Sequence, residues 1–273
     1  MLPGPADYVP TRLLNGAADV AHESGYLLDV VGLEGDASAR AERMRTLLHP
    51  ENVDGILSFT PLSTGMAGVD LTSFTVPVLV EGEYDDNMRA QGLLADASTM
   101  AQIVRRLAAD GHRRFVHVAG SDLWTSARNR RMVYETTVAQ LGLTSCAVVE
   151  GDWTVRSGWD AATTVIARCG ATAVLAANDR VAFGIIQGLQ SMQVDVPGQV
   201  SVVGWDDEEI GRFMRPALST VSIDRERQGR EAMGRLLALL RGEAPASLPA
   251  PSDFSHLVLR ESTGPAPDAP PPV

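Results

Sequence analysis

Two stretches in the second half of the chain decide its fold: Thr172-Ala-Val-Leu-Ala-Ala-Asn178-Asp179 and Val196-Pro-Gly-Gln-Val-Ser-Val-Val-Gly204-Trp205-Asp206-Asp207. Each is a short apolar run that ends abruptly in polar residues, which is the pattern of a buried parallel strand. In open α/β sheets, ligands bind outside the carboxyl ends of such strands. We therefore expect one pocket, suited to a small molecule rich in hydroxyl or amide-like groups, that is lined by Asn178, Asp179, Trp205, Asp206 and Asp207.

The rest of the chain alternates between apolar runs and amphipathic stretches that end at glycine. Helices are expected over residues 12–24, 37–48, 98–110, 127–141, 157–168, 180–192 and 225–241. Strands are expected over residues 26–31, 53–59, 76–80, 115–119, 146–150, 171–177, 200–204 and 256–260. This alternation predicts parallel sheets with helices on both faces, and this number of strands suits two doubly wound lobes better than one sheet. The proline-rich tail, residues 264–273, is expected to be disordered.

The composition limits the possible functions. A net charge of −11 argues against nucleic-acid binding by this chain itself, because affinity for the phosphate backbone depends on clustered cations. All 23 residues counted as Lys or Arg are Arg, which excludes Schiff-base chemistry on lysine. No apolar run approaches the roughly 20 residues that span a bilayer, and the first residues do not resemble a secretory signal. We therefore expect a cytoplasmic protein with no membrane contact.

No catalytic or metal-binding constellation stands out in the 273 residues. Dinucleotide, P-loop, zinc-protease and nucleophile-elbow motifs are absent from the sequence. Cys146 and Cys169 lack metal-ligand spacing and are expected to be reduced thiols, while His112 and His117 are expected to be structural. The pair Asp206-Asp207 lacks a third ligand at sensible spacing. We therefore expect binding rather than catalysis, with no cofactor and no metal.

Seven motifs in register resemble the effector-binding core of the LacI/GalR-type bacterial transcriptional regulators. The resemblance covers the chain from about Pro10 to Thr263. The motifs are Gly111–Gly120 (GHRRFVHVAG), Ala127–Arg130, Gly151–Trp153 with Ser157–Trp159, Thr172–Asp179, Val196-Pro197 with Ser201–Asp207, Pro216–Val221 and Leu257–Thr263.

This resemblance implies a periplasmic-binding-protein-like core of type I, in which two Rossmann-like α/β lobes are joined by three crossovers and hold an effector between them. The crossovers are implied near Asp96–Ser98, Val221–Ser222 and Pro249–Ala250. One lobe would then comprise residues 1–97 and 222–249, and the other residues 98–221 and 250–263.

By the same resemblance, the effector-binding residues are Trp124, Ser126, Arg130, Trp153, Asn178 and Asp206. Asp206 can accept two hydrogen bonds from a vicinal diol, and Arg130 presents a fixed fork of donors. The indole rings offer flat apolar faces of the kind on which sugars stack. Trp159 and Trp205 are expected mostly to fill the core.

The implied function is an effector-binding and dimerisation core that controls operator binding allosterically, with a sugar as the expected effector. A homodimer is expected through the helix that begins at Val181-Ala182-Phe183, with Gly16 and Ala17 contributing. The family's helix-turn-helix head and first core strand have no counterpart here apart from Met1-Leu2-Pro3, so DNA would be contacted only through a head outside this chain. The segment Ala6–Pro10, which should also face the effector, matches the family poorly.

Two alternatives stay open at the level of sequence. A transport-type sugar-binding protein of the same fold is disfavoured by the missing signal peptide and by the regulator-like ending Leu257–Thr263. An α/β enzyme would need a catalytic group that the motifs do not supply.

Overall fold

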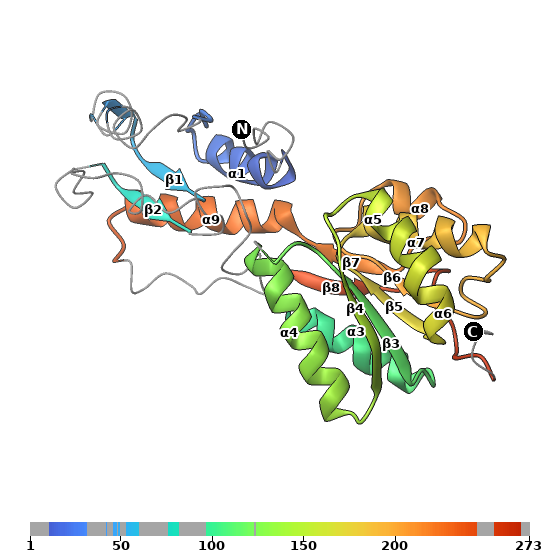
Figure 1. The fold of residues 1–273 in the computed structure, drawn as a ribbon. Coiled ribbons are helices and arrows are strands. Elements are labelled where there is room, and N and C mark those ends of the chain that lie inside the picture. The colour runs from blue at the N-terminus through green and yellow to red at the C-terminus, as the bar shows by residue number, and fades with distance from the viewer. Residues whose placement is uncertain are drawn as a thin grey trace. The chain divides into compact units, whose positions relative to one another are not determined.

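The computed structural model describes residues 11–31, 42, 46–47, 49, 53–59, 76–81, 97–122, 124–244 and 254–268. The chain divides into two compact units, residues 1–94 with 224–254 and residues 95–223 with 255–273 (Figure 1). It passes from one unit to the other after Leu94, Ile223 and Phe254. Of the implied crossovers, the one near Pro249–Ala250 lies outside the described residues, as do Met1–Leu2–Pro3, Ala6–Pro10 and most of the helix expected over 37–48.

The second unit is built on a four-stranded parallel sheet. Its strands are β3 (Arg114–Ala119), β4 (Thr144–Glu150), β5 (Ala173–Ala176) and β6 (Ser201–Val203), in the order β4-β3-β5-β6. All residues of β5 and β6 are buried, as their uninterrupted apolar sequences predict. The strand order reverses between β3 and β5, which makes the sheet doubly wound as expected.

Helices cover both faces of this sheet. On one face, α3 (Ser98–Ala109) and α4 (Thr125–Gln140) pack over a core that includes Phe115 and Tyr134. On the other face, α5 (Val155–Ala161) and α7 (Asp179–Ser191) pack over a core that includes Val116. Phe115 and Val116 are neighbours on β3 but lie in different cores, because successive strand side chains point to opposite faces.

The helix expected over residues 157–168 is interrupted. A π-helical turn, η4 (Ala162–Ile166), separates α5 from the short α6 (Ala167–Cys169), and Gly170 ends the segment with φ 65°. A single extra residue in a helical turn leaves the apolar spacing almost unchanged, so the sequence pattern does not reveal it. The one-turn helix α8 (Ile210–Phe213) is likewise an addition to the expected elements.

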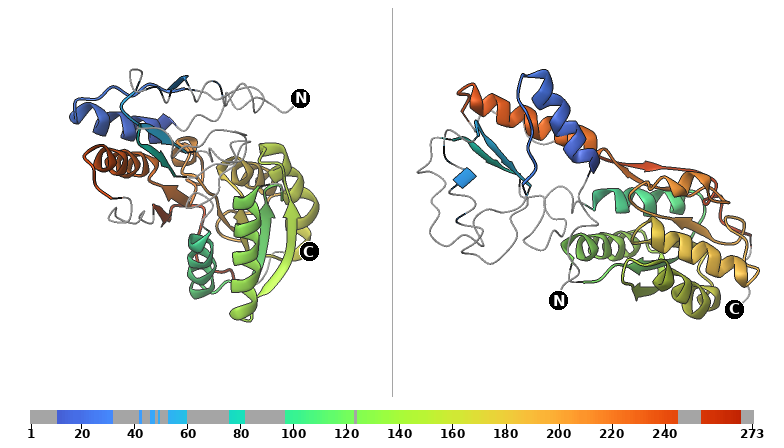
Figure 2. Two further views of the ribbon diagram at one scale, coloured as in Figure 1. Left: turned by 90° about the vertical axis from the view of Figure 1, so that its left-hand side faces the viewer. Right: turned by 90° about the horizontal axis from the view of Figure 1, so that it is seen from above.

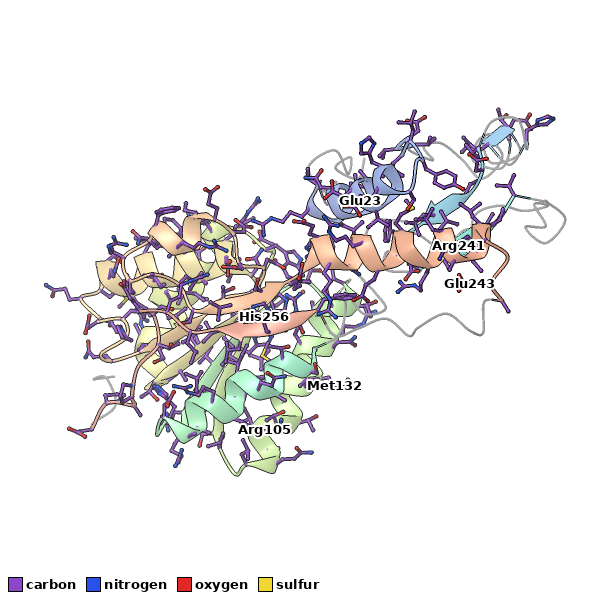
Figure 3. The ribbon with its side chains drawn as sticks, turned by 180° about the vertical axis from the view of Figure 1, so that it is seen from behind. Glu23, Arg105, Met132, Arg241, Glu243 and His256 are labelled. Atoms are coloured by element: carbon purple, nitrogen blue, oxygen red, sulfur yellow. The ribbon has the colours of Figure 1, made fainter. Side chains whose placement is uncertain are left out.

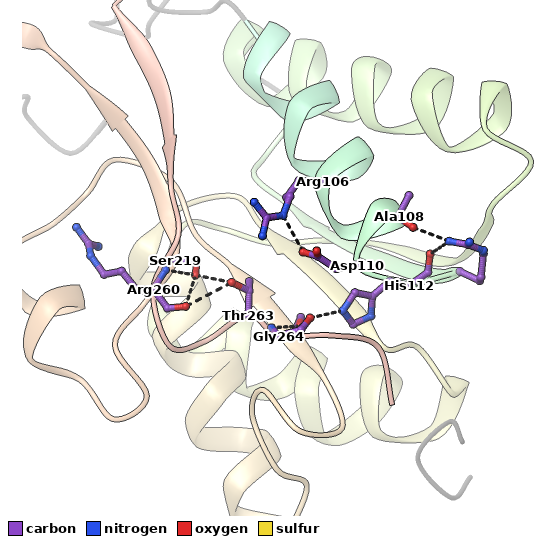
Figure 4. Close-up of polar contacts among 10 residues, drawn as sticks. Arg106, Ala108, Asp110, His112, Ser219, Arg260, Thr263 and Gly264 are labelled. Atoms are coloured by element: carbon purple, nitrogen blue, oxygen red, sulfur yellow. Dashed lines mark hydrogen bonds and ion pairs between the residues drawn. The ribbon is translucent and has the colours of Figure 1, made fainter. Parts of the chain in front are cut away.

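The C-terminal segment of the second unit is joined to the rest of that unit by hydrogen bonds (Figure 4). Strand β7 (Thr220–Ile223) pairs in antiparallel fashion with β8 (Ser255–Val258). Beyond β8, the Gly264 N–H donates to Ser201 Oγ at 3.1 Å, and the Gly264 carbonyl lies 3.1 Å from the His112 ring. The Ala266 N–H donates to the Asp110 carbonyl. The expectation that the tail is disordered from residue 264 is therefore wrong for Gly264–Ala266, whose backbone polar groups are paired with the folded unit.

The first unit is organised by the long helix α9 (Arg225–Leu240), which packs along α1 (Thr11–Glu23) (Figure 2). A Cβ at Gly16 would collide with the Glu226 carbonyl, and one at Gly229 with the Leu13 carbonyl. The two backbones therefore touch through glycines. Gly16 and the buried Ala17 are used inside the unit, so the expectation that they contribute to a dimer face is wrong.

Two short parallel strands, β1 (Ile56–Ser58) and β2 (Val78–Val80), complete the described part of this unit. The strand expected over 26–31 does not form, and Leu27 is 95% exposed. A strand needs a paired backbone neighbour, and among the described residues β1 and β2 pair only with each other. None of the described helices has the length and hydropathy to cross a membrane.

Charged side chains, among them Glu23, Arg241 and Glu243, project from the surface of the first unit (Figure 3). Arg230 of α9 contacts Asp19 at 2.7 Å and Glu23 at 3.8 Å, and Arg241 contacts Glu243 at 3.2 Å. All of these groups are exposed, so each pair contributes at most about 1 kcal/mol. The buried glycine contact of α1 with α9 is the stronger determinant of how these helices pack.

Candidate functional site

The six expected effector-binding residues all lie in the second unit, around the carboxyl ends of its parallel strands. Trp153 follows β4, Asn178 follows β5 and Asp206 follows β6. Trp124 immediately precedes α4, which carries Ser126 and Arg130 in its first turns. The reversal of strand order between β3 and β5 is the point at which open α/β sheets bind ligands. The topology thus brings the predicted residues to the predicted edge of the sheet.

Arg130 is the central side chain of this edge. It is buried, with 6% exposure, and its Nη1 donates to the Ala177 carbonyl at 2.5 Å. The guanidinium carbon lies 4.1 Å from the ring centroid of Trp205 and 5.9 Å from that of Trp153. A guanidinium at these distances is attracted to the faces of the indole rings. Trp205 is buried as expected, but it also serves as the platform on which Arg130 rests.

Trp153 has an unusual backbone and a tightly confined ring. Its φ is 70°, a left-handed conformation that is rare for a bulky residue. Its ring lies directly against Gly120, where a Cβ would collide with the indole. The ring of Trp124 lies 5.6 Å away at an interplanar angle of 63°, an edge-to-face contact. Gly120 was not among the expected site residues, and the only signal for it is its position directly after β3.

Asn178 joins two of these elements. Its Oδ1 accepts a hydrogen bond from Val181 N at 2.8 Å and so caps the start of α7. Its Nδ2 donates to the Trp153 carbonyl at 3.3 Å. The amide therefore helps to hold the strained Trp153 backbone, while each of its two polar atoms can still take part in one more hydrogen bond.

Ser126 and Asp206 occupy the remaining positions. Ser126 is buried on α4, one helical turn before Arg130. Asp206 directly follows Trp205, is partly exposed, and has a φ of 105°. Its N–H donates to the Val221 carbonyl at 2.9 Å. The backbone at Asp206 is therefore held in a sparsely populated conformation, a feature that concentrates at functional sites.

Two acids that were expected to line the pocket have structural partners instead. Asp179 is buried, its Oδ1 accepts from Thr220 Oγ1 and its Oδ2 from Glu208 N, both at 2.6 Å. Burial raises the pKa of Asp179 to about 7, against the opposite effect of these hydrogen bonds. Asp207 accepts from Arg260 at 2.5 Å and from Arg212 at 2.9 Å. Burial favours the neutral acid, but these arginines hold the pKa of Asp207 below its ordinary value.

Two hydrogen-bond donors near the candidate site lack an acceptor among the described residues. The indole Nε1 atoms of Trp153 and Trp205 are buried and have no hydrogen-bond acceptor in the described part of the chain. A buried donor without an acceptor is costly, so its presence near a candidate site favours a ligand that brings acceptors.

Within the described ranges, no group of three or more His, Cys, Asp or Glu side chains could hold a metal ion. Trp159, expected to pack, is 38% exposed on α5.

Comparison with known proteins places the chain in a family. Residues 104–263 match the periplasmic binding protein-like domain. The ribose operon repressor of Haemophilus influenzae is 24% identical over 234 residues, 84% of this chain and 70% of the relative. The lactose operon repressor of Klebsiella pneumoniae is 31% identical over 250 residues, 85% of this chain and 66% of the relative.

Among solved structures, a sugar-binding transcriptional regulator of the LacI family from Escherichia coli, complexed with phosphate, is 27% identical with a TM-score of 0.72. The match covers 94% of this chain and 93% of that one. These findings confirm the two-lobed fold and the resemblance seen in the sequence motifs. The chain is similar to LacI-type transcriptional regulators, and it belongs to the periplasmic binding protein-like domain family.

Proposed function

We propose that this chain is the effector-binding core of a LacI-type transcriptional regulator and that its effector is a sugar. The effector would contact the cluster formed by Trp124, Ser126, Arg130, Trp153, Asn178 and Asp206. Support comes from the relatives, which are named for the ribose and lactose operons, and from the position of the cluster at the strand-order reversal.

One observation carries the proposal most directly. Arg130 lies between two indole rings whose buried Nε1 donors have no acceptor among the described residues. A sugar offers hydroxyl oxygens as acceptors and apolar C–H faces for stacking, so it suits the partly exposed indole of Trp153. The Asp206 carboxylate would accept hydrogen bonds from hydroxyl groups of the same molecule.

The proposed mechanism is a shift between two conformations of the regulator. A ligand moves such an equilibrium only by its difference in affinity for the two states. The effector would favour one state. A DNA-binding head outside these residues would contact the operator, and its affinity for the operator would change with that state. Such a regulator acts in the bacterial cytoplasm, and no catalytic step is assigned to any residue of the cluster.

Homodimerisation is part of the proposal, with helix α7 as the expected contact. Val181 and Ala182 are fully buried in the core beneath α7, so they are not available to a partner. Phe183 is only partly buried and is the residue of the expected triplet that could reach one.

The test is a thermal-shift screen of the purified chain against ribose, lactose, other mono- and disaccharides and matched polyols. A ligand at about 100 times its Kd stabilises the native state by about 2.7 kcal/mol, an easily visible shift. We expect one sugar to stabilise the chain and to change its tryptophan fluorescence, because Trp124 and Trp153 lie in the cluster. A well-folded sample that responds to none of the sugars would contradict the proposal.

The assignment of the site has its own test. Asp206→Asn keeps the size of the side chain and removes its charge, and should weaken the binding of that sugar at least tenfold. Glu209→Gln is a matched control, because Glu209 is an exposed acid three residues further along the chain. Equal affinities for wild type and Asp206→Asn would remove Asp206 from the site.

A further inference from the structure

The two cysteines of the chain lie on one face of the sheet of the second unit. Both are free thiols, Cys146 on the edge strand β4 and Cys169 at the end of α6. Both pack against the same core cluster, the one beneath α5 and α7. Each is only partly buried, so a small reagent in solution can reach this face of the molecule.

A β-bulge directs Cys146 to that face. Phe115 of β3 pairs with Ser145 of β4, whereas the next residue, Val116, pairs with Ala147. Cys146 is therefore the extra residue of a bulge. Regular alternation would send Cys146 and Ala147 to opposite faces, but both pack on the cluster beneath α5 and α7.

A second irregularity positions Cys169. The π-helical turn Ala162–Ile166 precedes α6 and shifts the register of the residues that follow it. Arg114, at the start of β3, donates to the Cys169 carbonyl at 2.6 Å and to the Gly170 carbonyl at 2.9 Å. Because Arg114 pairs with Thr144 of β4, its side chain ties the end of α6 to the two strands that flank the bulge.

The electrostatics of Cys146 agree with this placement. Burial, followed by the neighbouring Cys169 side chain, raises the pKa of Cys146, while Arg114 acts in the opposite direction. The placement itself comes from the bulge at Cys146, from the shared core cluster and from the Arg114 hydrogen bonds to the end of α6. Two partly buried thiols therefore lie on one face of the sheet, with the Arg114 side chain at the end of α6 and Arg114 itself two residues before the bulge partner of Cys146.

We propose that Cys146 and Cys169 form a reversible intramolecular disulfide when the protein meets hydrogen peroxide. One thiol is first oxidised by the peroxide to a sulfenic acid, and one water is released. The second thiol then attacks the sulfenic sulfur, which forms the S–S bond and releases a second water. Both sulfurs are oxidised and both oxygen atoms of the peroxide leave as water, so the step is balanced.

The disulfide would cross-link the edge strand β4 to the end of α6. The polypeptide enclosed by this link includes Trp153 and the whole of α5. Since the link closes a loop that is free in the unfolded chain, the oxidised protein should melt at a higher temperature than the reduced protein. The proposal does not depend on the identity of the effector or on effector binding.

The experiment uses the full chain, reduced and then freed of reductant, at native pH. After incubation with a small excess of hydrogen peroxide, intact mass and thiol titration are measured, and circular dichroism checks that the chain is still folded. We expect a loss of two hydrogen atoms in mass, a loss of both thiols, one peptide pair linked through Cys146 and Cys169, and full reversal by dithiothreitol.

Cys146→Ser and Cys169→Ser serve as matched controls, in which the remaining thiol should gain oxygen atoms and lose no hydrogen pair. Wild type that only gains oxygen, at the rate of the single variants, would overturn the proposal. So would disulfide-linked dimers in place of the intramolecular product, or an internal disulfide that appears only in urea. The mass change of the wild-type chain distinguishes disulfide formation from oxygen addition even if a serine variant fails to fold.

Discussion

The guanidinium carbon of Arg130 lies 4.1 Å from the ring centroid of Trp205, while the same side chain donates to the Ala177 carbonyl. These contacts join helix α4 to the segments that follow strands β5 and β6. The buried arginine is therefore held in one orientation by a flat ring and a backbone oxygen. Any effector that reaches this edge of the sheet would meet a cation that is already in place, with little entropy left to lose on binding.

Replacing Arg130 by lysine should impair this arrangement although the charge is kept. An ammonium group cannot stack on Trp205 with a planar face, nor reproduce the guanidinium fork. We expect Arg130→Lys to weaken effector binding at least tenfold and to lower the free energy of unfolding by about 1–3 kcal/mol, measured by calorimetric titration and urea unfolding. Arg131→Lys is the matched control, because the Arg131 side chain is 41% exposed and its ion pairs in the described residues are with the surface acids Asp122 and Glu135. Equal losses in both variants would contradict the assigned role of Arg130.

Adding one methyl group at Gly120 should displace Trp153. A Cβ at this position would collide with the indole ring, which must then move away from β3. We expect Gly120→Ala to alter the tryptophan emission and to weaken effector binding about tenfold or more, with the circular dichroism unchanged. Gly211→Ala provides a control, since its Cβ would meet neighbours only at ordinary contact distances of 3.4 Å and beyond. Unaltered emission in Gly120→Ala would show that the ring can yield without consequence.

Two glycines of helix α9 should respond to alanine in opposite directions. At Gly229 a Cβ would collide with the Leu13 carbonyl of α1, whereas at Gly234 nothing lies within 4 Å. Gly229→Ala should therefore lower the free energy of unfolding by about 1–3 kcal/mol, the usual cost of overpacking. Gly234→Ala should raise it by about 0.5–1 kcal/mol, because alanine is the better helix former. Thermal unfolding of both variants tests this, and equal effects would argue against close contact of α1 with α9.

The titration of Asp179 should make stability fall as pH rises. Burial raises its pKa to about 7, so the folded protein keeps a proton that the unfolded chain has lost. The contribution of Asp179 to stability is thus full below about pH 4, its ordinary pKa, and is lost as pH rises through about 7. Asp179→Asn removes this titration. We expect the stability of the variant relative to wild type to increase by on the order of 2–3 kcal/mol between pH 5 and pH 8.

Urea unfolding of wild type and Asp179→Asn across this pH range measures that difference. His117 acts in the opposite direction, because burial lowers its pKa to about 4, and its contribution is lost as pH falls from about 6.5 toward 4. His117 is present in both proteins, so its effect cancels in the comparison. A difference that stays constant from pH 5 to pH 8 would mean that Asp179 titrates normally.

Much of the fold could be predicted because it depends on local pattern. The apolar runs that end at Asn178 and before Asp206 specify buried parallel strands, and glycines mark the ends of the intervening helices. The irregularities could not be predicted in this way. The bulge at Cys146 and the π-helical turn Ala162–Ile166 each add one residue to an element whose apolar periodicity barely changes.

The sequence by itself determined which residues arrive at the carboxyl edge of the sheet, because strand ends follow from hydrophobic patterning. Only the tertiary structure decided which of them turn toward long-range partners. Asp206 and Asp207 are adjacent, are the same residue type, and both have positive φ. Asp207 nevertheless accepts a hydrogen bond from Arg260, more than fifty residues away in the chain, whereas Asp206 was placed at the candidate site. Backbone conformation at a turn and the location of a distant arginine are properties of the folded chain, so no pattern of neighbouring residues reveals them.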